Sequence, residues 1–311
     1  MMLSEYFNPK KTLNLFGYNE KFTFLKNLLL SDRFPHVLML TGEKGIGKST
    51  LINHLLHYYY DKENYNDENN IIDSKSVFHN QFINNLFPNI IYLSDNNLVN
   101  MKIDEIRKLK QHLLKTPIIQ KKRFIILDDV ESLNINSLNA LLKIIEEPNK
   151  FNFFILINNK TKSILETLKS RSIEITVILR QKEKEDIILS LIDLYDQKLK
   201  IDKNFFDISP GNFLKFNSFL NDKKIDISEK FSSNLRKILE LYKKEKNIIY
   251  KDLLIFLVNY YSRKSNLTSS KDNDKIIAGR NYVIKQVNNF FVYNMNQNSL
   301  INALERNLIN D

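Results

Sequence analysis

The sequence contains no cysteine, so the chain can form neither a disulfide bond nor a zinc site built on thiolates. The absence of thiols fits a reducing compartment, and we expect a cytoplasmic protein. Long apolar runs are absent as well, because no stretch approaches the roughly 18 residues of a membrane-spanning helix. The opening residues MMLSEYFNPKKT also lack the apolar core of a signal peptide. We therefore expect no contact with a membrane and no bound zinc.

Glycine is scarce too, and its distribution is informative. The chain has six glycines, and three of them lie between positions 42 and 47, in the run GEKGIGKS. This run fits the phosphate-binding pattern G-x-x-x-x-G-K-[S/T] without a gap. The apolar run HVLMLT precedes it, and apolar residues at helical spacing follow it from Thr50 to Tyr60. Strand, glycine loop and helix in this order favour a nucleotide site over an accidental turn.

Each part of this loop has a physical role in phosphate binding. Glycines let successive backbone N–H groups point at phosphate oxygens, and the start of the following helix adds its partial positive charge. We expect Lys48 to reach the outer phosphates and the Ser49 hydroxyl to bind Mg2+. The residues expected to contact the nucleotide are Gly42, Glu43, Lys44, Gly45, Ile46, Gly47, Lys48, Ser49 and Thr50.

The length of 311 residues suggests two or three domains. Hydrophobic residues make up 43% of the chain and charged residues 26%, as in an ordinary globular protein. The net charge of +10 is compatible with nucleic-acid binding, but the basic residues are scattered rather than clustered. Charge alone therefore leaves contact with DNA open.

Apolar runs of strand length alternate with helical patterns over the first part of the chain. Strands are predicted at 36–41, 89–93, 124–127, 151–157 and 173–179. Helices are predicted at 19–30, 50–60, from 103 to the Thr116-Pro117 pair, at 136–147 and at 164–169. This alternation predicts an α/β domain over 1–179, in which helices cover both sides of a parallel sheet.

Only helical patterns follow Arg180. Helices at 181–199 and 210–220 predict a small helical domain over 180–225. Further helices are predicted at 235–241, 253–260, 276–293 and 300–308. They favour an all-helical bundle as the last domain, over 226–311.

Two features near the second helix carry less information. The stretch from Asp61 to Asn80 is polar and rich in Asn, and we interpret it as a loop or flexible insertion. Before it, His54 and His57 lie three positions apart, and Asp61 lies four positions further on. Because this spacing does not define a third metal ligand, we interpret the two histidines as ordinary surface residues.

Several motifs resemble the sliding-clamp loader subunits of the AAA+ class. The run NALLKIIEEP at 139–148 resembles their NALLKxxEEP block, and FFILINN followed by Ser170-Arg171-Ser172 resembles their sensor strand and serine-arginine-cysteine motif. The IDEIR helix at 103–107 is similar as well, and Ser209-Pro210-Gly211 resembles the SPG turn of the delta-prime type. The resemblance covers most of residues 1–180 and implies an AAA+ domain, a small helical lid and a helical collar.

Within this family the chain resembles the delta-prime type of DNA polymerase III more than the gamma/tau motors. Gamma/tau subunits carry a four-cysteine zinc module between the phosphate loop and the second strand, and this chain has no cysteine. The resemblance implies a five-subunit ring with gamma/tau and delta subunits as partners. It also implies contact with a sliding clamp and with the backbone of primer–template DNA, and use of ATP and Mg2+.

The resemblance also implies roles for individual residues. Asp128 takes the magnesium-facing position beside Ser49, at the carboxyl end of the sheet, where nucleotides bind in open α/β folds. Asp129 stands where active members have the glutamate that polarises water. Asn159 matches the first sensor, and Arg171 matches the arginine finger, which faces the nucleotide of the neighbouring subunit.

Two departures from the family pattern affect the nucleotide site. The Asp129 side chain is one methylene shorter than glutamate, and a displacement of about 1 Å in a catalytic group can cost on the order of a hundredfold in rate. Asn212 stands where motor subunits place the second sensor arginine, and its amide cannot neutralise phosphate charge. The sequence thus predicts nucleotide binding with weak or absent turnover.

A phosphate loop is also typical of three other kinds of protein. The chain could be a self-sufficient AAA+ ATPase, such as a gamma-type motor, or a ring member with a vestigial pocket. A phosphate-loop kinase would need an arginine-rich lid, and the region after Arg180 shows no such cluster.

Overall fold

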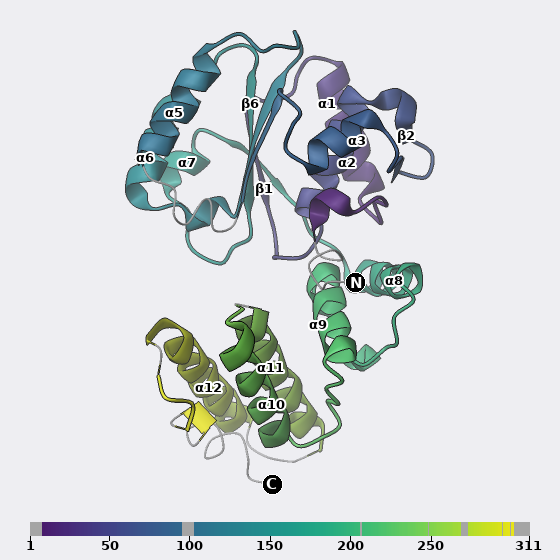
Figure 1. The fold of residues 1–311 in the computed structure, drawn as a ribbon, viewed down its shortest axis with the longest axis vertical. Coiled ribbons are helices and arrows are strands. Elements are labelled where there is room, and N and C mark those ends of the chain that lie inside the picture. The colour runs from purple at the N-terminus through teal and green to yellow at the C-terminus, as the bar shows by residue number, and fades with distance from the viewer. Residues whose placement is uncertain are drawn as a thin grey trace. The chain divides into compact units, whose positions relative to one another are not determined.

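The structure is a computed structural model that describes residues 8–94, 103–205, 207–247, 249–268, 273–293, 295–298 and 300–301. The chain divides into two compact units, which we describe separately (Figure 1). The first comprises residues 1–196 and 206–215, and the second comprises residues 197–205 and 216–311. The division into domains 1–179, 180–225 and 226–311 stays a prediction.

The first unit is built on a parallel sheet with the strand order β4-β5-β6-β1-β7. Its strands are β1 (Val37–Thr41), β4 (Ile90–Leu93), β5 (Arg123–Asp128), β6 (Asn152–Asn158) and β7 (Ile173–Thr176). Strand β1 lies between β6 and β7, so the loop that follows it leaves from inside the sheet. The unbroken apolar sequences of β1, β5 and β6 suit strands that are buried on both faces.

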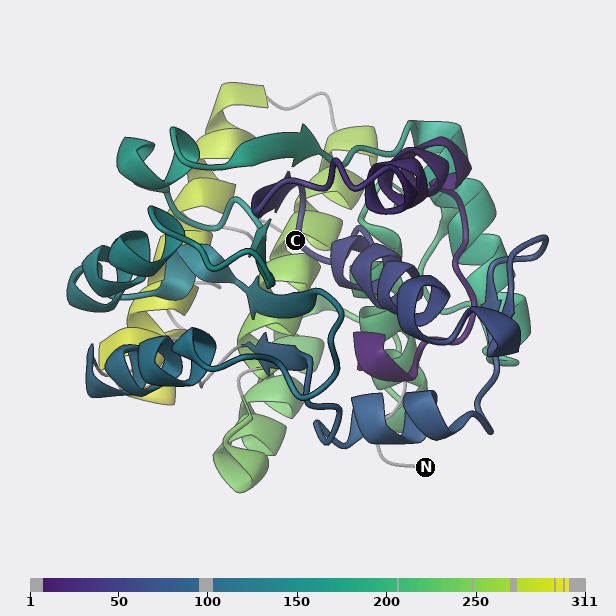
Figure 2. The same ribbon diagram turned by 90° about the horizontal axis from the view of Figure 1, so that it is seen from above.

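Helices cover both faces of this sheet (Figures 1 and 2). One face carries α1 (Asn19–Leu30), α2 (Lys48–Tyr60) and α3 (Val77–Ile83), and the other carries α5 (Ile103–Leu114), α6 (Ile135–Ile145) and α7 (Glu166–Lys169). Alternate residues of β1 point to opposite faces of the sheet. Leu38 and Leu40 pack with the first set of helices, and Val37 and Met39 pack with the second. The predicted α/β fold with a parallel sheet is confirmed.

The remaining elements described are mainly helical. They are α8 (Gln181–Leu194), the 3-10 turn Lys203–Phe205, α9 (Pro210–Asp222), α10 (Phe231–Glu245), α11 (Ile249–Thr268) and α12 (Asn273–Tyr293). Apolar side chains of α10, α11 and α12 are fully buried, among them Leu235, Leu253 and Val283. Of the helix predicted at 300–308, all but residues 300–301 lie outside the described part of the chain. None of the helices described is both long and apolar enough to cross a membrane.

The segment after α2 differs from its interpretation as a loop. It contains a 3-10 turn at Lys62–Asn64, an antiparallel pair of β2 (Tyr65–Asn66) and β3 (Ile71–Ile72), and the start of α3. Tyr65 and Ile72 form one of the paired positions, and both are buried in the core shared with α1 and α2. Two-residue strands are too short to show an alternating pattern, so the surrounding Asn and Asp residues dominated the prediction.

The two histidines of α2 are buried, so their interpretation as surface residues was wrong. Their exposed fractions are 0% for His54 and 1% for His57. His57 Nδ1 donates to Asn53 O at 2.7 Å, and its Nε2 lies 3.0 Å from His79 Nδ1. His54 Nδ1 lies 3.1 Å from the Tyr65 hydroxyl. The insertion after α2 thus covers a helix face that would otherwise be exposed.

This burial predicts a specific dependence of stability on pH. Burial lowers the pKa of His54 to about 3 and that of His57 to about 4, whereas the pKa of histidine in an unfolded chain is about 6.5. Below pH 6.5 the unfolded chain therefore binds more protons. The free energy of unfolding should fall as the pH decreases from 6.5 toward 4, by about 1.4 kcal/mol per pH unit for each histidine.

Urea denaturation of the full chain at pH 7 and pH 5 checks this expectation. His57→Leu should remove about one histidine's share of the difference between the two pH values. Leu56→Ala, at a fully buried position of the same helix, should lower stability equally at both. A His57→Leu variant with the unchanged pH dependence would contradict the burial argument.

Candidate nucleotide-binding site

The glycine loop lies between β1 and α2, as the sequence predicts. Gly45 and Gly47 have φ angles of +81° and +101°, which L side chains rarely adopt. A Cβ atom on Gly42 would lie 2.3 Å from Val177 O, so no side chain fits there. Helix α2 begins at Lys48, directly after the loop. The three glycines are therefore required by the backbone path, and the path leads to a helix N-terminus.

Lys48 lies buried within the loop. Its Nζ donates to Gly42 O and Glu43 O, at 2.8 Å each. Burial lowers the pKa of Lys48 to about 8, while the nearby Asp128 and other carboxylates act in the opposite direction. The ammonium group is thus charged for the most part at neutral pH and is held at the site where phosphates are expected.

The two predicted magnesium ligands meet. Ser49 Oγ donates to Asp128 Oδ2 at 2.7 Å, and the Tyr92 hydroxyl donates to the same oxygen at 2.9 Å. A hydroxyl and a carboxylate from different elements, side by side next to a phosphate loop, fit the all-oxygen preference of Mg2+. Ser49 and Asp128 are the residues that would hold the ion.

Asp129 and Asn159 also meet. Asn159 Nδ2 donates to Asp129 Oδ1, and Lys44 Nζ lies 3.2 Å from Asp129 Oδ2. Asp129 has a φ angle of +67°, in the left-handed region, and its side chain is largely buried. Both carboxylate oxygens of Asp129 are therefore engaged by protein groups.

Glu131 supports the loop that carries Asn159, a role that the sequence did not reveal. The residue is buried, and its Oε1 accepts from Asn159 N at 3.0 Å, Thr161 N at 3.3 Å and Thr161 Oγ1 at 2.9 Å. A carboxylate that accepts three hydrogen bonds from one short segment fixes the path of that segment. The available signal was an acidic residue between the apolar residues Val130 and Leu133.

The start of α9 is hydrogen-bonded to the backbone of the phosphate loop. Ser209 Oγ and Asn212 Nδ2 both donate to Lys44 O, at 2.6 and 3.0 Å, and Gly211 N donates to Gly45 O at 2.8 Å. From the other side, the Tyr18 hydroxyl donates to Ile46 O at 2.5 Å. The SPG turn and Asn212 thus contact the loop backbone itself.

Arg171 does not join these residues. It follows α7, and its guanidinium donates to Glu146, to Thr167 O and, at 3.5 Å, to Ser170 Oγ. None of these partners belongs to the phosphate loop. Of the predicted site residues, Arg171 alone is placed apart from the nucleotide site of its own chain.

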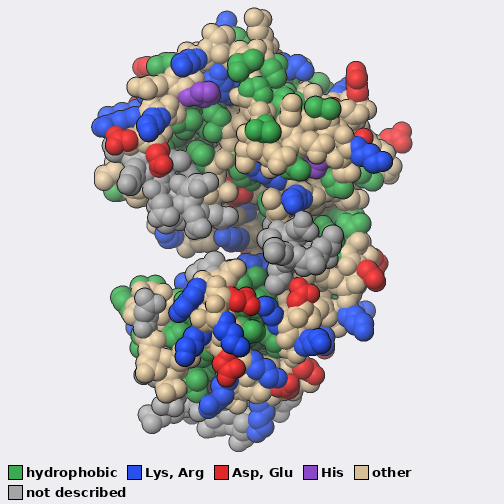
Figure 3. Space-filling model, viewed as in Figure 1, with side chains coloured by type: hydrophobic (Ala, Val, Ile, Leu, Met, Phe, Trp, Pro, Cys, Tyr) green, Lys and Arg blue, Asp and Glu red, His purple; other side chains and the backbone are tan. Residues whose placement is uncertain are grey.

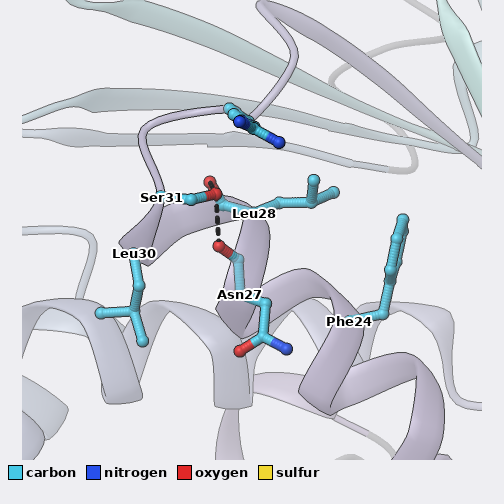
Figure 4. Close-up of a pocket in the computed structure, with 6 residues that line it drawn as sticks. Phe24, Asn27, Leu28, Leu30 and Ser31 are labelled. Carbon is cyan, nitrogen blue, oxygen red and sulfur yellow. Dashed lines mark hydrogen bonds between the residues drawn. The ribbon is translucent and has the colours of Figure 1, made fainter.

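A shallow pocket elsewhere in the first unit is distinct from this site. It lies at the C-terminal end of α1, where the Ser31 hydroxyl donates to Asn27 O at 2.7 Å (Figure 4). Its lining residues are Phe24, Asn27, Leu28, Leu30, Ser31 and Arg33. The nucleotide site lies at the other end of α1, where Tyr18 contacts the loop.

The contact between α9 and the loop makes Gly211 sensitive to substitution. A Cβ atom at this position would lie 2.7 Å from Gly45 O, which is a backbone atom and cannot move aside cheaply. Gly211→Ala should therefore lower the free energy of unfolding by about 1–3 kcal/mol. Asn212→Ala, which removes one hydrogen bond, should cost about 0.5–1.5 kcal/mol. Urea denaturation of the full chain measures both, and a neutral Gly211→Ala would contradict the contact.

Comparisons with known proteins show which family this chain resembles in sequence. A family model described as "DNA polymerase III, delta subunit" matches residues 17–180, a span that includes the phosphate loop, Asp128, Asn159 and Arg171. The DNA polymerase III subunit delta' of Buchnera aphidicola subsp. Schizaphis graminum is 30% identical over 210 residues, which cover 61% of this chain and 60% of that protein. The subunit gamma of Buchnera aphidicola subsp. Acyrthosiphon pisum is 25% identical over 186 residues, which cover 59% of this chain and 49% of that protein.

The chain thus spans less than two thirds of the length of these curated relatives. Among solved structures, a DNA polymerase III gamma subunit-related protein from Thermotoga maritima aligns with a TM-score of 0.48 at 16% identity, over 92% of this chain and 98% of that one. The family model covers more than half of the chain. The chain therefore belongs to the DNA polymerase III delta-subunit family of clamp-loader proteins.

Proposed function

We propose that the chain is a cytoplasmic, delta-prime-type subunit of the DNA polymerase III clamp loader. It binds ATP with Mg2+ mainly as a structural element, and it donates Arg171 to the nucleotide site of a neighbouring gamma/tau subunit. The observation that carries the proposal is the combination of a complete phosphate loop with an Asp129 whose two oxygens are already engaged.

Support for nucleotide binding comes from the loop. Gly45 and Gly47 have the positive φ angles that such a loop requires, and Lys48 places its charge inside it. ATP with Mg2+ would supply a triphosphate whose negative charge matches the loop amides, the α2 N-terminus and Lys48. Ser49 and Asp128 would hold the ion.

Support for weak turnover comes from Asp129 and Asn212. Asp129 is shorter than glutamate, and its contacts with Asn159 and Lys44 occupy both oxygens, so it is poorly placed to polarise water. Asn212 is neutral and donates to Lys44 O. The site therefore lacks both a well-placed base and an arginine at this position.

Support for a role in trans comes from Arg171. Its side chain is 37% exposed and its partners lie outside the phosphate loop of its own chain. An exposed arginine on a turn can reach a phosphate of an adjacent subunit, where such residues contribute on the order of a thousandfold or more to hydrolysis.

The second unit fits a collar that holds a ring of five subunits with gamma/tau and delta. Several Lys and Arg side chains lie on its visible face, interspersed with Asp and Glu (Figure 3). Basic side chains of this kind contact the phosphate backbone of primer–template DNA without reading its sequence. In this assembly the chain would help to open or hold a sliding clamp.

A catalytically competent gamma-type ATPase is the alternative. The retained phosphate loop and the 25% identity to a subunit gamma favour it. The engaged Asp129 carboxylate argues against it.

Nucleotide binding should depend on Lys48. Lys48→Ala removes a charged donor to phosphate, so the affinity for a fluorescent ATP analogue should fall about ten- to hundredfold. Lys26→Ala removes a lysine of α1 that is paired with Asp67, outside the loop, and should bind as the parent does. If neither the parent chain nor Lys48→Ala binds the ATP analogue, the pocket is vestigial.

Hydrolysis by the neighbouring subunit should depend on Arg171. In the reconstituted complex, Arg171→Ala should reduce DNA-stimulated ATPase at the adjacent site by on the order of a thousandfold, while the ring still assembles. Arg107→Ala is a control, since this exposed arginine pairs with Asp104, three positions away on the same helix. Unchanged ATPase in Arg171→Ala would show that the assigned role is wrong.

A further inference from the structure

Two segments of the first unit that lie far apart in the sequence meet beside Arg171. Helix α6 ends at Ile145, and Glu146 is its C-cap residue. Helix α7 ends at Lys169, and Arg171 follows it within the turn that leads to β7. Both helices lie on the same face of the sheet (Figure 1). The last turn of α6 therefore delivers a carboxylate to the arginine.

The contact between the two side chains has a defined geometry. Arg171 Nε and Nη2 lie 2.9 and 2.7 Å from the same carboxylate oxygen, Glu146 Oε1. Nη1 donates to Thr167 O at 3.0 Å. A guanidinium has five N–H groups, and Glu146 accepts from two of them, the N–H of Nε and one N–H of Nη2. The second N–H of Nη2 points away from Glu146 and remains for another acceptor.

We propose that Glu146 is a positioning residue for Arg171, an inference that rests on the proposed role of Arg171 in trans. Glu146 binds Nε and Nη2 of the guanidinium and leaves the second N–H of Nη2 for a phosphate of the neighbouring subunit. A free arginine loses much rotamer freedom when it binds, and this contact imposes that loss before the subunits meet.

The solvent exposure of the Arg171–Glu146 pair sets how much hydrolysis should depend on Glu146. The side chains of Arg171 and Glu146 are 37% and 46% exposed, and ion pairs of this kind are weak. Loss of Glu146 should therefore reduce hydrolysis by about three- to tenfold, well below the loss of the arginine itself. The opposite outcome has a physical basis as well, because a carboxylate that competes with phosphate would lower activity, and its removal would raise it.

The experiment compares variants in the reconstituted complex with its motor subunits and primer–template DNA. Glu146→Ala should lower kcat of the ATPase by about three- to tenfold and leave KM for ATP unchanged, since the arginine acts on the transition state. Glu146→Gln should recover much of the loss, because one oxygen accepts both hydrogen bonds and the amide retains an oxygen. Glu147→Ala, at the exposed neighbouring position, should behave as the parent does.

The double variant separates positioning from a general structural effect. Glu146→Ala should add nothing to Arg171→Ala if the carboxylate acts through the arginine. Unchanged or raised kcat in Glu146→Ala would overturn the positioning role, and so would a further loss in the double variant. If Arg171→Ala alone has no effect, the proposed function and this inference both fail. If Arg171→Ala is impaired and Glu146→Ala is not, only the positioning role fails.

Discussion

Hydrogen bonds to the backbone carbonyl groups of the phosphate loop hold the site in shape. Lys48 binds the carbonyls of Gly42 and Glu43, Ser209 binds that of Lys44, and Tyr18 binds that of Ile46. These donors come from α2, from the residue before α9 and from the residue before α1. The path of the loop is therefore fixed by contacts from three helices, and it ends at the N-terminus of α2, where phosphate binding is favoured.

The same loop connects the acidic strand end, the sensor segment and α9. Lys44 pairs with Asp129 through its side chain and accepts from the start of α9 through its carbonyl. Asp129 in turn binds Asn159, whose segment is anchored by Glu131. Because Lys44, Asp129 and Asn159 already bind one another, the network favours a rigid site that binds nucleotide over one that cycles through catalysis. This supports a subunit that shapes a ring while its neighbour carries out hydrolysis.

Local sequence patterns predict some elements of this structure, but not the contacts between segments that lie far apart in the chain. The glycine loop, β5 and β6 were predictable because their signals lie in short unbroken runs, and the meeting of Ser49 with Asp128 follows from the ends of parallel strands. His57 was misjudged because its burial depends on His79, which a later segment brings to it. The hydrogen bonds between α9 and the phosphate loop were not predictable either, since the residues that form them, such as Ser209 and Lys44, lie more than 160 positions apart.

We propose that this chain holds a nucleotide while hydrolysis occurs in the adjacent subunit. The most direct measurement is to incubate the purified chain alone with Mg2+, radiolabelled ATP and primer–template DNA, and to identify the nucleotide that remains bound. We expect the bound nucleotide to be recovered as ATP, with negligible release of phosphate over many minutes. Rapid multiple turnover by the isolated chain would contradict it.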